Sequence, residues 1–491
     1  MQHQHQPQSK PADGRSRVAI IGTGLAGLTT AYLLQQDKQK RYDVTLFEQA
    51  PKLSLDAASV TLKNETTGSL ERVDIPPRSF NRGFYPNLCR MYDYLGVPYQ
   101  HISLIWVWAK VSSAGLSQIP TAEAVPTMSG SYFTYGKRLH EALLISPQFW
   151  LQGNLKNVLL TLYLALCHAW FFAACFFFPP RMIQPEKYMD VKSSAKNSKT
   201  MESFRQYLDR IWLPERYALY YLLPVLSIIA SCSHAEMLDF PASDVANFMK
   251  GSFLRTTYVA KGGINRVQAT LVDGIQDVRM QTRVTKVERV DGGVLLRYES
   301  LQDEKRSSFE QVFDRVVLAV SPNVAAAIFN PSKHLLSVIP TVPVTSTVVA
   351  SPGTKASVVR EHTHIPSGEC SYRSGETQLM AFRTTFSDSI VQTESLHYLE
   401  GGLVVRTSPM GDVAEVKGTL DMSRFTRTLR TTESRNMVIA MNEADNGNGW
   451  VNGKDNVWVI GSWCWDGMVL LEGCVISAMR AAKDLGVNVP W

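Results

Sequence analysis

The sequence lacks paired cysteines, an apolar leader and a strong excess of either charge. Its 7 cysteines are scattered over 491 residues without a CxxC pair, which argues against a disulfide framework or zinc ribbon and favours a reducing compartment. Residues 1–15 are polar, so we expect a disordered tail and no signal peptide there. The 50 Lys and Arg against 44 Asp and Glu leave a net charge of only +6, so no nucleic-acid partner is expected.

Motifs of several enzyme classes are also missing. There is no GxSxG elbow of a serine hydrolase and no HExxH helix of a zinc protease. The compact histidine cluster Glu361–His364 lacks a third ligand on a rigid scaffold, so no metal site is expected. Hydrophobic residues make up 45% of the chain, which is enough apolar mass for a core and excludes wholesale disorder.

One long apolar run, Val158–Phe178, breaks the pattern of an ordinary soluble enzyme. As a helix it would be about 31 Å long, which is close to the thickness of the bilayer hydrocarbon core. Aromatic residues at its far end and basic residues after it suit a membrane interface and anionic lipid head groups. We expect a membrane-dipping helix or re-entrant hairpin, with a fully buried helix as the alternative.

A glycine-rich turn near the N-terminus carries the clearest chemical signal. Val18–Ile21 is typical of a buried parallel strand, Gly22–Gly27 follows with GxGxxG spacing, and Leu25–Gln36 has helical periodicity. The next strand ends at Glu48. A carboxylate there accepts hydrogen bonds from ribose hydroxyls and disfavours a 2′-phosphate, so we do not expect NADP in this site.

Each of the three glycines has a role in a dinucleotide-binding turn. Gly22 permits the tight turn, Gly24 lets the backbone approach a pyrophosphate, and Gly27 lets the helix pack on the strand. The backbone N–H groups at the helix start, at Leu25 and Ala26, are expected to hold the phosphates with help from the helix dipole.

Three further segments fit the same picture: Lys261–Ile264, which leads into the strand containing Val284; Phe313–Ala319; and Gly461–Gly473. With the glycine turn, they make the chain resemble the FAD-dependent amine oxidase and phytoene desaturase superfamily, in a branch of NAD/FAD-binding-type proteins of bacteria and fungi. The resemblance implies FAD as cofactor. It places the cofactor-binding positions at Gly22, Gly24, Leu25, Ala26, Gly27, Glu48, Val284, Gly461, Ser462, Val469 and Leu470.

The resemblance also implies an α/β fold, in which a Rossmann-type FAD-binding domain is interleaved with an α+β substrate domain. The FAD-binding domain is expected at residues 16–100, 256–330 and 441–491. The substrate domain is expected at residues 101–255, which are helical and contain the apolar run, and at residues 331–440, which are β-rich.

The sequence departs from the family pattern after Glu48. The family usually has Gly-Gly-Arg or Gly-Gly-His there, whereas this chain has Leu53–Ser59. Either the loop takes another route past the flavin, or Asp56 and Ser59 supply polar contacts to it. The family's VDxG segment appears as Val73–Pro77.

In this family the flavin accepts a hydride, so no acid–base pair is required and none is visible. Trp463 and Trp465 are candidates for a substrate cage near the flavin ring, with packing between domains as the alternative. His362 is a further active-site candidate, with an ordinary surface hairpin as the alternative.

The leading functional hypothesis is a membrane-associated FAD-dependent enzyme that oxidises or desaturates a lipophilic small molecule. If both ends of the chain bind FAD, they must lie on the same side of a membrane, and a single span at Val158–Phe178 would separate them. We therefore expect the whole catalytic domain on the cytoplasmic side. The endoplasmic reticulum surface is a candidate location. The alternatives are a non-catalytic flavin-binding membrane protein and a flavin amine oxidase acting on a soluble amine. The C-terminal motif argues against an NAD-dependent dehydrogenase. Lipid and a lipophilic substrate are the expected partners, and the oligomeric state stays open.

Overall fold

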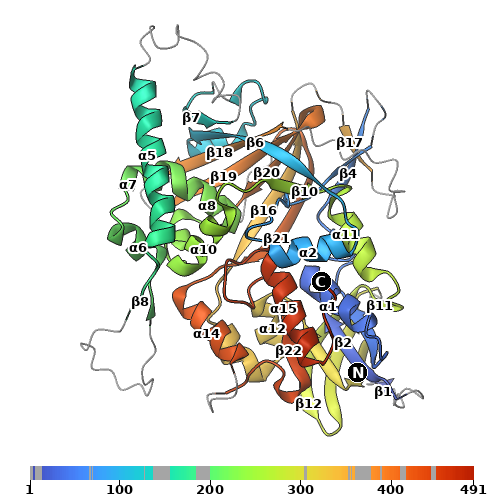
Figure 1. Ribbon diagram of the computed structural model, residues 1–491. Coiled ribbons are helices and arrows are strands. Elements are labelled where there is room, and N and C mark those ends of the chain that lie inside the picture. The colour runs from blue at the N-terminus through green and yellow to red at the C-terminus, as the bar shows by residue number, and fades with distance from the viewer. Residues whose placement is uncertain are drawn as a thin grey trace.

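The computed structural model has two parts, each built around a large sheet (Figure 1). The five-stranded sheet with α1 and α15 lies in the lower right of the view. The eight-stranded sheet lies above it, with helices α5, α6, α8 and α10 beside it on the left. The structure describes residues 4–5, 14–65, 68, 70–125, 128–136, 155–183, 200–302, 307–351, 354, 356–359, 377–387, 390–409, 416–443 and 449–491.

The five-stranded sheet is parallel and has the order β11-β3-β2-β15-β22. Its central strand β2 buries Val18–Ile21 completely or nearly so, because helices cover both faces of such a sheet. The strands come from three separate stretches of chain, so the half with the five-stranded sheet is interleaved with the other half, and the expected α/β fold class is confirmed. The elements are β2 Ser16–Ile21, α1 Leu25–Gln35, β3 Tyr42–Phe47, β11 Asp277–Arg279, β15 Arg315–Leu318, β22 Val457–Val459 and α15 Leu471–Asp484.

The eight-stranded sheet has the order β10-β6-β18-β19-β20-β16-β21, with β7 paired to β6. All of its pairs are antiparallel except β6 with β18. Its strands are β6 Tyr99–Lys110, β7 Ser131–Tyr135, β10 Thr257–Ala260, β16 Thr341–Ala350, β18 Thr377–Phe386, β19 Val391–Leu399, β20 Leu403–Ser408 and β21 Thr419–Thr428.

Helices fill the space between and beside the two sheets. One hydrophobic core runs from Leu28 on α1 through Leu88 on α2 to Phe204 on α6 and Leu226 on α8, and so joins the two halves. The helices are α2 Pro86–Tyr94, α5 Leu155–Phe177, α6 Phe204–Arg210, α7 Glu215–Tyr217, α8 Leu223–Ala230, α9 His234–Leu238, α10 Ala242–Ser252, α11 Gly263–Val272, α12 Pro322–Ile328, α13 Lys333–Leu336 and α14 Thr432–Asn442.

Three smaller sheets complete the described fold. Gln4–His5, inside the segment predicted to be a disordered tail, form a short strand that pairs with Phe309 and Glu310 of β14. The strands of these sheets are β1 Gln4–His5, β4 Val60–Asn64, β5 Leu70–Val73, β8 Met182–Ile183, β9 Thr200–Met201, β12 Thr282–Val290, β13 Gly293–Ser300, β14 Ser308–Phe313 and β17 Ala356–Val359.

The predicted apolar run forms helix α5, which stands at the outer edge of the eight-stranded half (Figure 1). Val158–Phe177 is the one stretch of the described residues that is long and apolar enough to cross a membrane, with a mean hydropathy of 1.9. Only 33% of that stretch is buried, so α5 packs against the protein on one side but is not enclosed in the core. Its inner face, which includes Phe171, Ala174 and Cys175, is fully buried against the protein.

Candidate flavin site

The turn between β2 and α1 is shaped as a phosphate cradle. Gly22 has φ of +100°, and a Cβ there would lie 2.5 Å from the carbonyl oxygen of Ala319. A Cβ on Gly27 would overlap the carbonyl oxygen of Gly22. At Gly24, by contrast, the nearest atom to an added Cβ is Ser54 Oγ at 3.9 Å, so space is left beside the helix start. No side chain caps α1, and its first N–H groups are available to an anion.

Glu48 is fixed at the tip of β3, next to this turn. Its Oε2 accepts hydrogen bonds from the backbone N of Thr23 at 3.2 Å and from Thr23 Oγ1 at 2.5 Å. Its Oε1 accepts the backbone N–H of Ala50 at 2.9 Å. These bonds hold a carboxylate that is only 6% exposed at the position where a ribose is expected.

Val284 lies on β12, near the same end of the sheet. The strand starts beside Glu48, because the N–H of Thr282 donates to the Glu48 carbonyl at 2.8 Å. Val284 is 8% exposed and lies at a β-bulge, where the register of β12 shifts. β3 and β12 thus meet at the place where the resemblance puts the adenine side of the cofactor.

The C-terminal motif follows β22. Gly461 is tied to α15 by Ser477, whose Oγ accepts the Gly461 N–H at 3.0 Å and donates to its carbonyl at 3.1 Å. Val469 and Leu470 immediately precede α15, and no side chain caps that helix either. Ser462 is half-buried in the turn between them.

These two motifs meet in space. β2 and β22 flank β15 in the sheet, so their carboxyl ends lie at one edge. Figure 1 shows α1 and α15 side by side above that edge. In an open parallel sheet such an edge is where nucleotide cofactors bind. The residues present therefore fit a dinucleotide: a pyrophosphate at α1, a ribose at Glu48, and the remaining half of the cofactor towards Val469 and Leu470.

The segments Val73–Pro77 and Lys261–Ile264, which resemble two family motifs, contact each other. Both carboxylate oxygens of Asp74 accept the N–H of Ile264 at the start of α11, at 3.1 and 3.0 Å. Gly263 has φ of +71°, and a Cβ there would lie 2.7 Å from Asp74 Oδ1. Burial raises the pKa of Asp74 to about 6, and the positive charge of Arg78 acts against that rise.

The loop that lacks the Gly-Gly pair is held by contacts within the protein. Asp56 pairs with Arg72 and also accepts the amide of Asn265 at 3.0 Å. Ser59 Oγ accepts the N–H of Ile75 at 3.3 Å. Ser59 Oγ thus already serves the fold as an acceptor, and the expectation that Asp56 and Ser59 supply polar contacts to the cofactor stays a prediction. Asp56 keeps one oxygen, Oδ1, without a partner among the described residues.

The two tryptophan candidates differ. Trp463 is 2% exposed and packs in the core formed with β22 and α12, so its position favours packing over a substrate cage. Trp465 is half-buried, lies against Gly467 and Gly473, and packs on Phe84 with ring centroids 6.1 Å apart. It remains a candidate. His362 lies outside the described residues.

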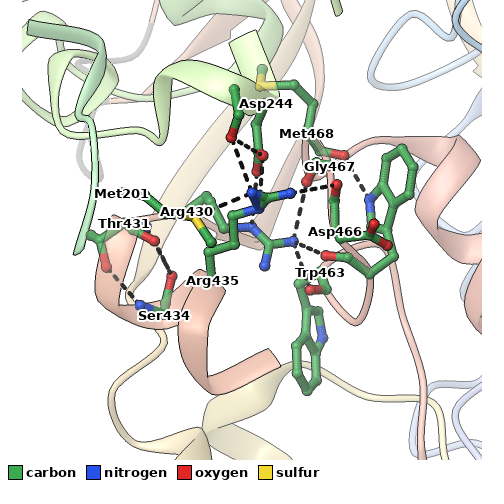
Figure 2. A network of polar contacts seen from close by, with 12 residues as sticks. Met201, Asp244, Arg430, Thr431, Ser434, Arg435, Trp463, Asp466, Gly467 and Met468 are labelled. Carbon is green, nitrogen blue, oxygen red and sulfur yellow. Dashed lines mark hydrogen bonds and ion pairs between the residues drawn. The ribbon is translucent and has the colours of Figure 1, made fainter. Parts of the chain in front are cut away.

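A buried network that sequence reasoning missed holds the tryptophan turn (Figure 2). Arg430 Nη2 donates to the carbonyls of Trp463 and Trp465 at 2.8 Å and of Gly467 at 3.2 Å. Asp244, on α10, has an oxygen 3.8 Å from Arg430 Nε.

A second arginine completes the network in Figure 2. Arg435 Nε lies 2.9 Å from Asp244, and its Nη2 donates to the Asp466 carbonyl at 3.0 Å. Burial raises the pKa of Asp244, and Arg430 and Arg435 oppose the rise. A helix of the eight-stranded half thereby fixes the loop after β22.

Comparison with known proteins agrees with this site. A family model described as flavin containing amine oxidoreductase matches residues 179–486, and one described as NAD(P)-binding Rossmann-like domain matches residues 20–95. No curated protein sequence matched the chain.

Two solved structures with similar folds illustrate the likeness. One is a CLA-producing fatty acid isomerase from P. acnes, with a TM-score of 0.55, 11% identity and coverage of 95% of this chain and 98% of that one. The other is a putrescine oxidase with a redesigned cofactor site, with a TM-score of 0.51, 13% identity and coverage of 96% and 98%. At such identities the likeness shows the fold alone. The family match over most of the chain, together with the cradle at α1, shows that the chain belongs to the flavin-containing amine oxidoreductase family and has FAD as its cofactor.

Proposed function

We propose that the protein is a membrane-associated FAD-dependent oxidoreductase that takes a hydride from a lipophilic small molecule. The observation that carries the proposal is the outward side of α5. Five apolar residues at helical spacing are exposed there: Leu159, Leu162, Leu166, Trp170 and Phe177. We call these residues the outer face of α5.

The outer face is unusual for a soluble protein. Leu166 is 71% exposed and Phe177 is 78% exposed, although the same helix buries its opposite side in the core. Scattered single apolar residues on a surface are normal, but a continuous stripe marks a site of interaction with another apolar phase or surface.

Two more strongly exposed residues extend the stripe. Trp212 and Leu254 are each 88% exposed. The indole of Trp170 donates to the Ile211 carbonyl at 2.8 Å, which brings Trp212 beside α5. The ring of Phe253 lies 4.7 Å from that of Phe172, which does the same for Leu254. Residues from three segments thus support one lipid-facing patch.

The packing of α5 supports shallow insertion rather than a span. A helix that crossed the bilayer alone would expose all of its sides, whereas the inner face of α5 rests on the protein. With FAD held by both chain ends, the patch would let the enzyme lie on one leaflet and take its substrate from the lipid. The six cysteines in the described part of the chain are free, which supports a cytoplasmic location.

The chemistry divides between cofactor and protein. FAD, when bound, supplies the hydride acceptor. The α1 N–H groups bind its phosphates and Glu48 binds a ribose. Arg430 fixes the turn that carries Trp465, and one hydrophobic core joins the two halves.

Vesicle binding tests the membrane part of the proposal. Replacing Leu162, Leu166 and Phe177 by Gln should abolish co-sedimentation with phospholipid vesicles, while bound flavin and thermal stability stay unchanged because these side chains are exposed. The matched control is Ile390→Gln, since Ile390 is 51% exposed and lies next to β19, outside α5. Equal binding by the triple variant and the wild type would refute a lipid-facing role for α5.

Anaerobic reduction tests the reaction. The flavin absorbance should bleach with a lipophilic substrate from a panel of fatty acids, isoprenoids and polyketides. Bleaching by a soluble amine instead would identify the enzyme as a flavin amine oxidase. A flavin that no substrate reduces and that oxygen does not reoxidise would identify a non-catalytic flavin-binding protein.

A further inference from the structure

Arg427, near the end of β21, points its guanidinium at the start of α15. Its Nη2 donates to the carbonyls of Val469 at 3.0 Å and Ile229 at 3.1 Å, and its Nε donates to the Ala230 carbonyl at 3.3 Å. Three carbonyls therefore fix the orientation of this side chain. Its Nη1 has no partner among the described residues.

Arg78 approaches the same region from the glycine turn. Its Nη2 donates to the Leu55 carbonyl at 2.8 Å, and the Leu55 N–H in turn donates to the Thr23 carbonyl at 3.2 Å. Its Nε is buried without a hydrogen-bond partner in the described part of the chain. Arg78 thus also keeps donor capacity that no described residue uses.

The two arginines act on a common neighbour, Cys474 on α15. Burial raises the pKa of the Cys474 thiol to about 11, and both guanidiniums oppose that rise. Burial also lowers the pKa of Arg427, and the like charge of Arg78 acts in the same direction. The geometry agrees, because Arg427 contacts the segment before α15, Arg78 contacts the loop bonded to the glycine turn before α1, and α1 packs on α15.

No carboxylate of the described residues lies within ion-pair distance of either guanidinium. Buried guanidiniums are normally paired, because removing an unpaired charge from water costs several kcal/mol. The arginines of the Asp244 network obey this rule, since both face a carboxylate. Arg427 and Arg78 are half-buried and have no such ion pair, and Asp74 is the one carboxylate of the described residues whose charge acts on Arg78.

We infer that Arg427 and Arg78 together form a binding site for an oxyanion, a carboxylate or phosphate group, beside the flavin. Arginine binds such groups through paired N–H donors, which these two side chains retain. Two sources have this chemistry: the phosphate groups of FAD, and the acidic head group of a lipophilic substrate. The second source rests on the proposed function, and the first does not.

The pair also bears on the substrate class. The two guanidiniums outnumber Asp74, the one described carboxylate whose charge acts on Arg78, so the pair repels an ammonium group and attracts a carboxylate. Within the lipophilic compounds of the proposed function, the site favours an acid, such as a fatty-acyl or isoprenoid carboxylate, over an amine.

The experiment uses full-length Arg427→Gln, Arg427→Lys and Arg78→Gln proteins. The matched control is Arg424→Gln, which removes the same charge from an exposed position on the same strand. In the first arm, each apoprotein is titrated with FAD. In the second arm, each FAD-loaded protein is titrated with decanoate, decanol and decylamine while flavin absorbance is followed. Circular dichroism and thermal unfolding report on the fold.

We expect the Gln variants to bind roughly tenfold to a hundredfold more weakly in one arm, with Arg427→Lys between them and the wild type. Weaker FAD binding assigns the oxyanion to the cofactor. Unchanged FAD binding with lost decanoate binding assigns it to the substrate. If Arg427→Gln does not fold, the affinities of Arg427→Lys and Arg78→Gln decide between these outcomes.

Unchanged affinities in both arms for folded variants would overturn the inference. The first arm does not depend on the substrate. A failure of the proposed function would appear as no vesicle binding and no flavin reduction by lipophilic compounds. That result is distinguishable from a failure of the arginine inference, which would leave both affinities unchanged.

Discussion

The carboxylate of Glu472 on α15 accepts the backbone N–H of Leu88, at the start of α2, at 3.0 Å. Its other oxygen accepts the backbone N–H of Asn87 at 3.0 Å and the Asn87 amide at 2.7 Å. No side chain of α2's own N-cap residue does this. Glu472 therefore caps α2 from another helix, and its negative charge lies at the positive end of the α2 dipole.

Removing this cap should destabilise the fold. We expect Glu472→Ala to lower the free energy of unfolding by about 3 kcal/mol, because it leaves buried N–H groups without an acceptor. Glu472→Gln keeps one acceptor oxygen and should cost less. Urea unfolding of the FAD-loaded protein measures both. An Ala variant as stable as the wild type would show that solvent replaces the carboxylate.

The glycine turn offers a matched pair of substitutions. Gly24→Ala adds a methyl group into open space, so we expect a folded protein that binds FAD at least tenfold more weakly, because the methyl group occupies the expected path of the pyrophosphate. Gly27→Ala places its methyl group on the Gly22 carbonyl, so we expect a loss of stability. FAD titration and thermal unfolding of both proteins separate the two effects. Equal FAD affinity for Gly24→Ala and the wild type would contradict the cradle.

Local patterns in the sequence predicted the half of the site that is local. Gly22, Gly24 and Gly27 lie within one turn, and Glu48 follows on the adjacent strand, so spacing and strand order suffice to place them. The long-range half could not be read from the sequence. Glu472 and Leu88 are 384 residues apart, and a carboxylate that caps another helix has the same sequence signature as one on a solvated face.

The apolar run shows a second limit. Apolar residues occupy every side of a helix formed by this run. The sequence alone therefore could not show that α5 buries Phe171 and exposes Leu166. Trp463 is a similar case. Its position next to the flavin motif suggested a substrate contact, whereas in the structure the indole packs in the core. The residues that pack against it come from segments distant in the sequence, so the sequence does not show this packing.

Asp74 should make stability depend on pH. Its folded pKa of about 6 is above the usual aspartate value of 3.8, and burial is the main cause. A raised pKa means that the native state holds the proton more tightly, so this stabilisation is complete below about pH 4 and is lost as pH rises through 6. The loss is about 3 kcal/mol.

The variant Asp74→Asn tests this assignment. Its amide oxygen can still accept the Ile264 N–H, but it cannot titrate. We expect the variant to be at least as stable as the wild type at pH 7 and to lack the decline between pH 4 and 6. Urea unfolding across that range measures the difference. A decline of equal size in both proteins would assign the titration to another group.

The link between Asp244 and Arg430 gives a final prediction. Arg430→Met leaves Asp244 buried beside only Arg435 and frees three carbonyls, so we expect a loss of about 3–5 kcal/mol and earlier release of FAD on heating. Adding Asp244→Asn to Arg430→Met removes the uncompensated charge and should recover part of the stability. It should not restore FAD retention, because the turn from Trp463 to Gly467 still lacks its donor. Flavin fluorescence during thermal unfolding reports both quantities, and full recovery of FAD retention in the double variant would show that Arg430 only balances charge.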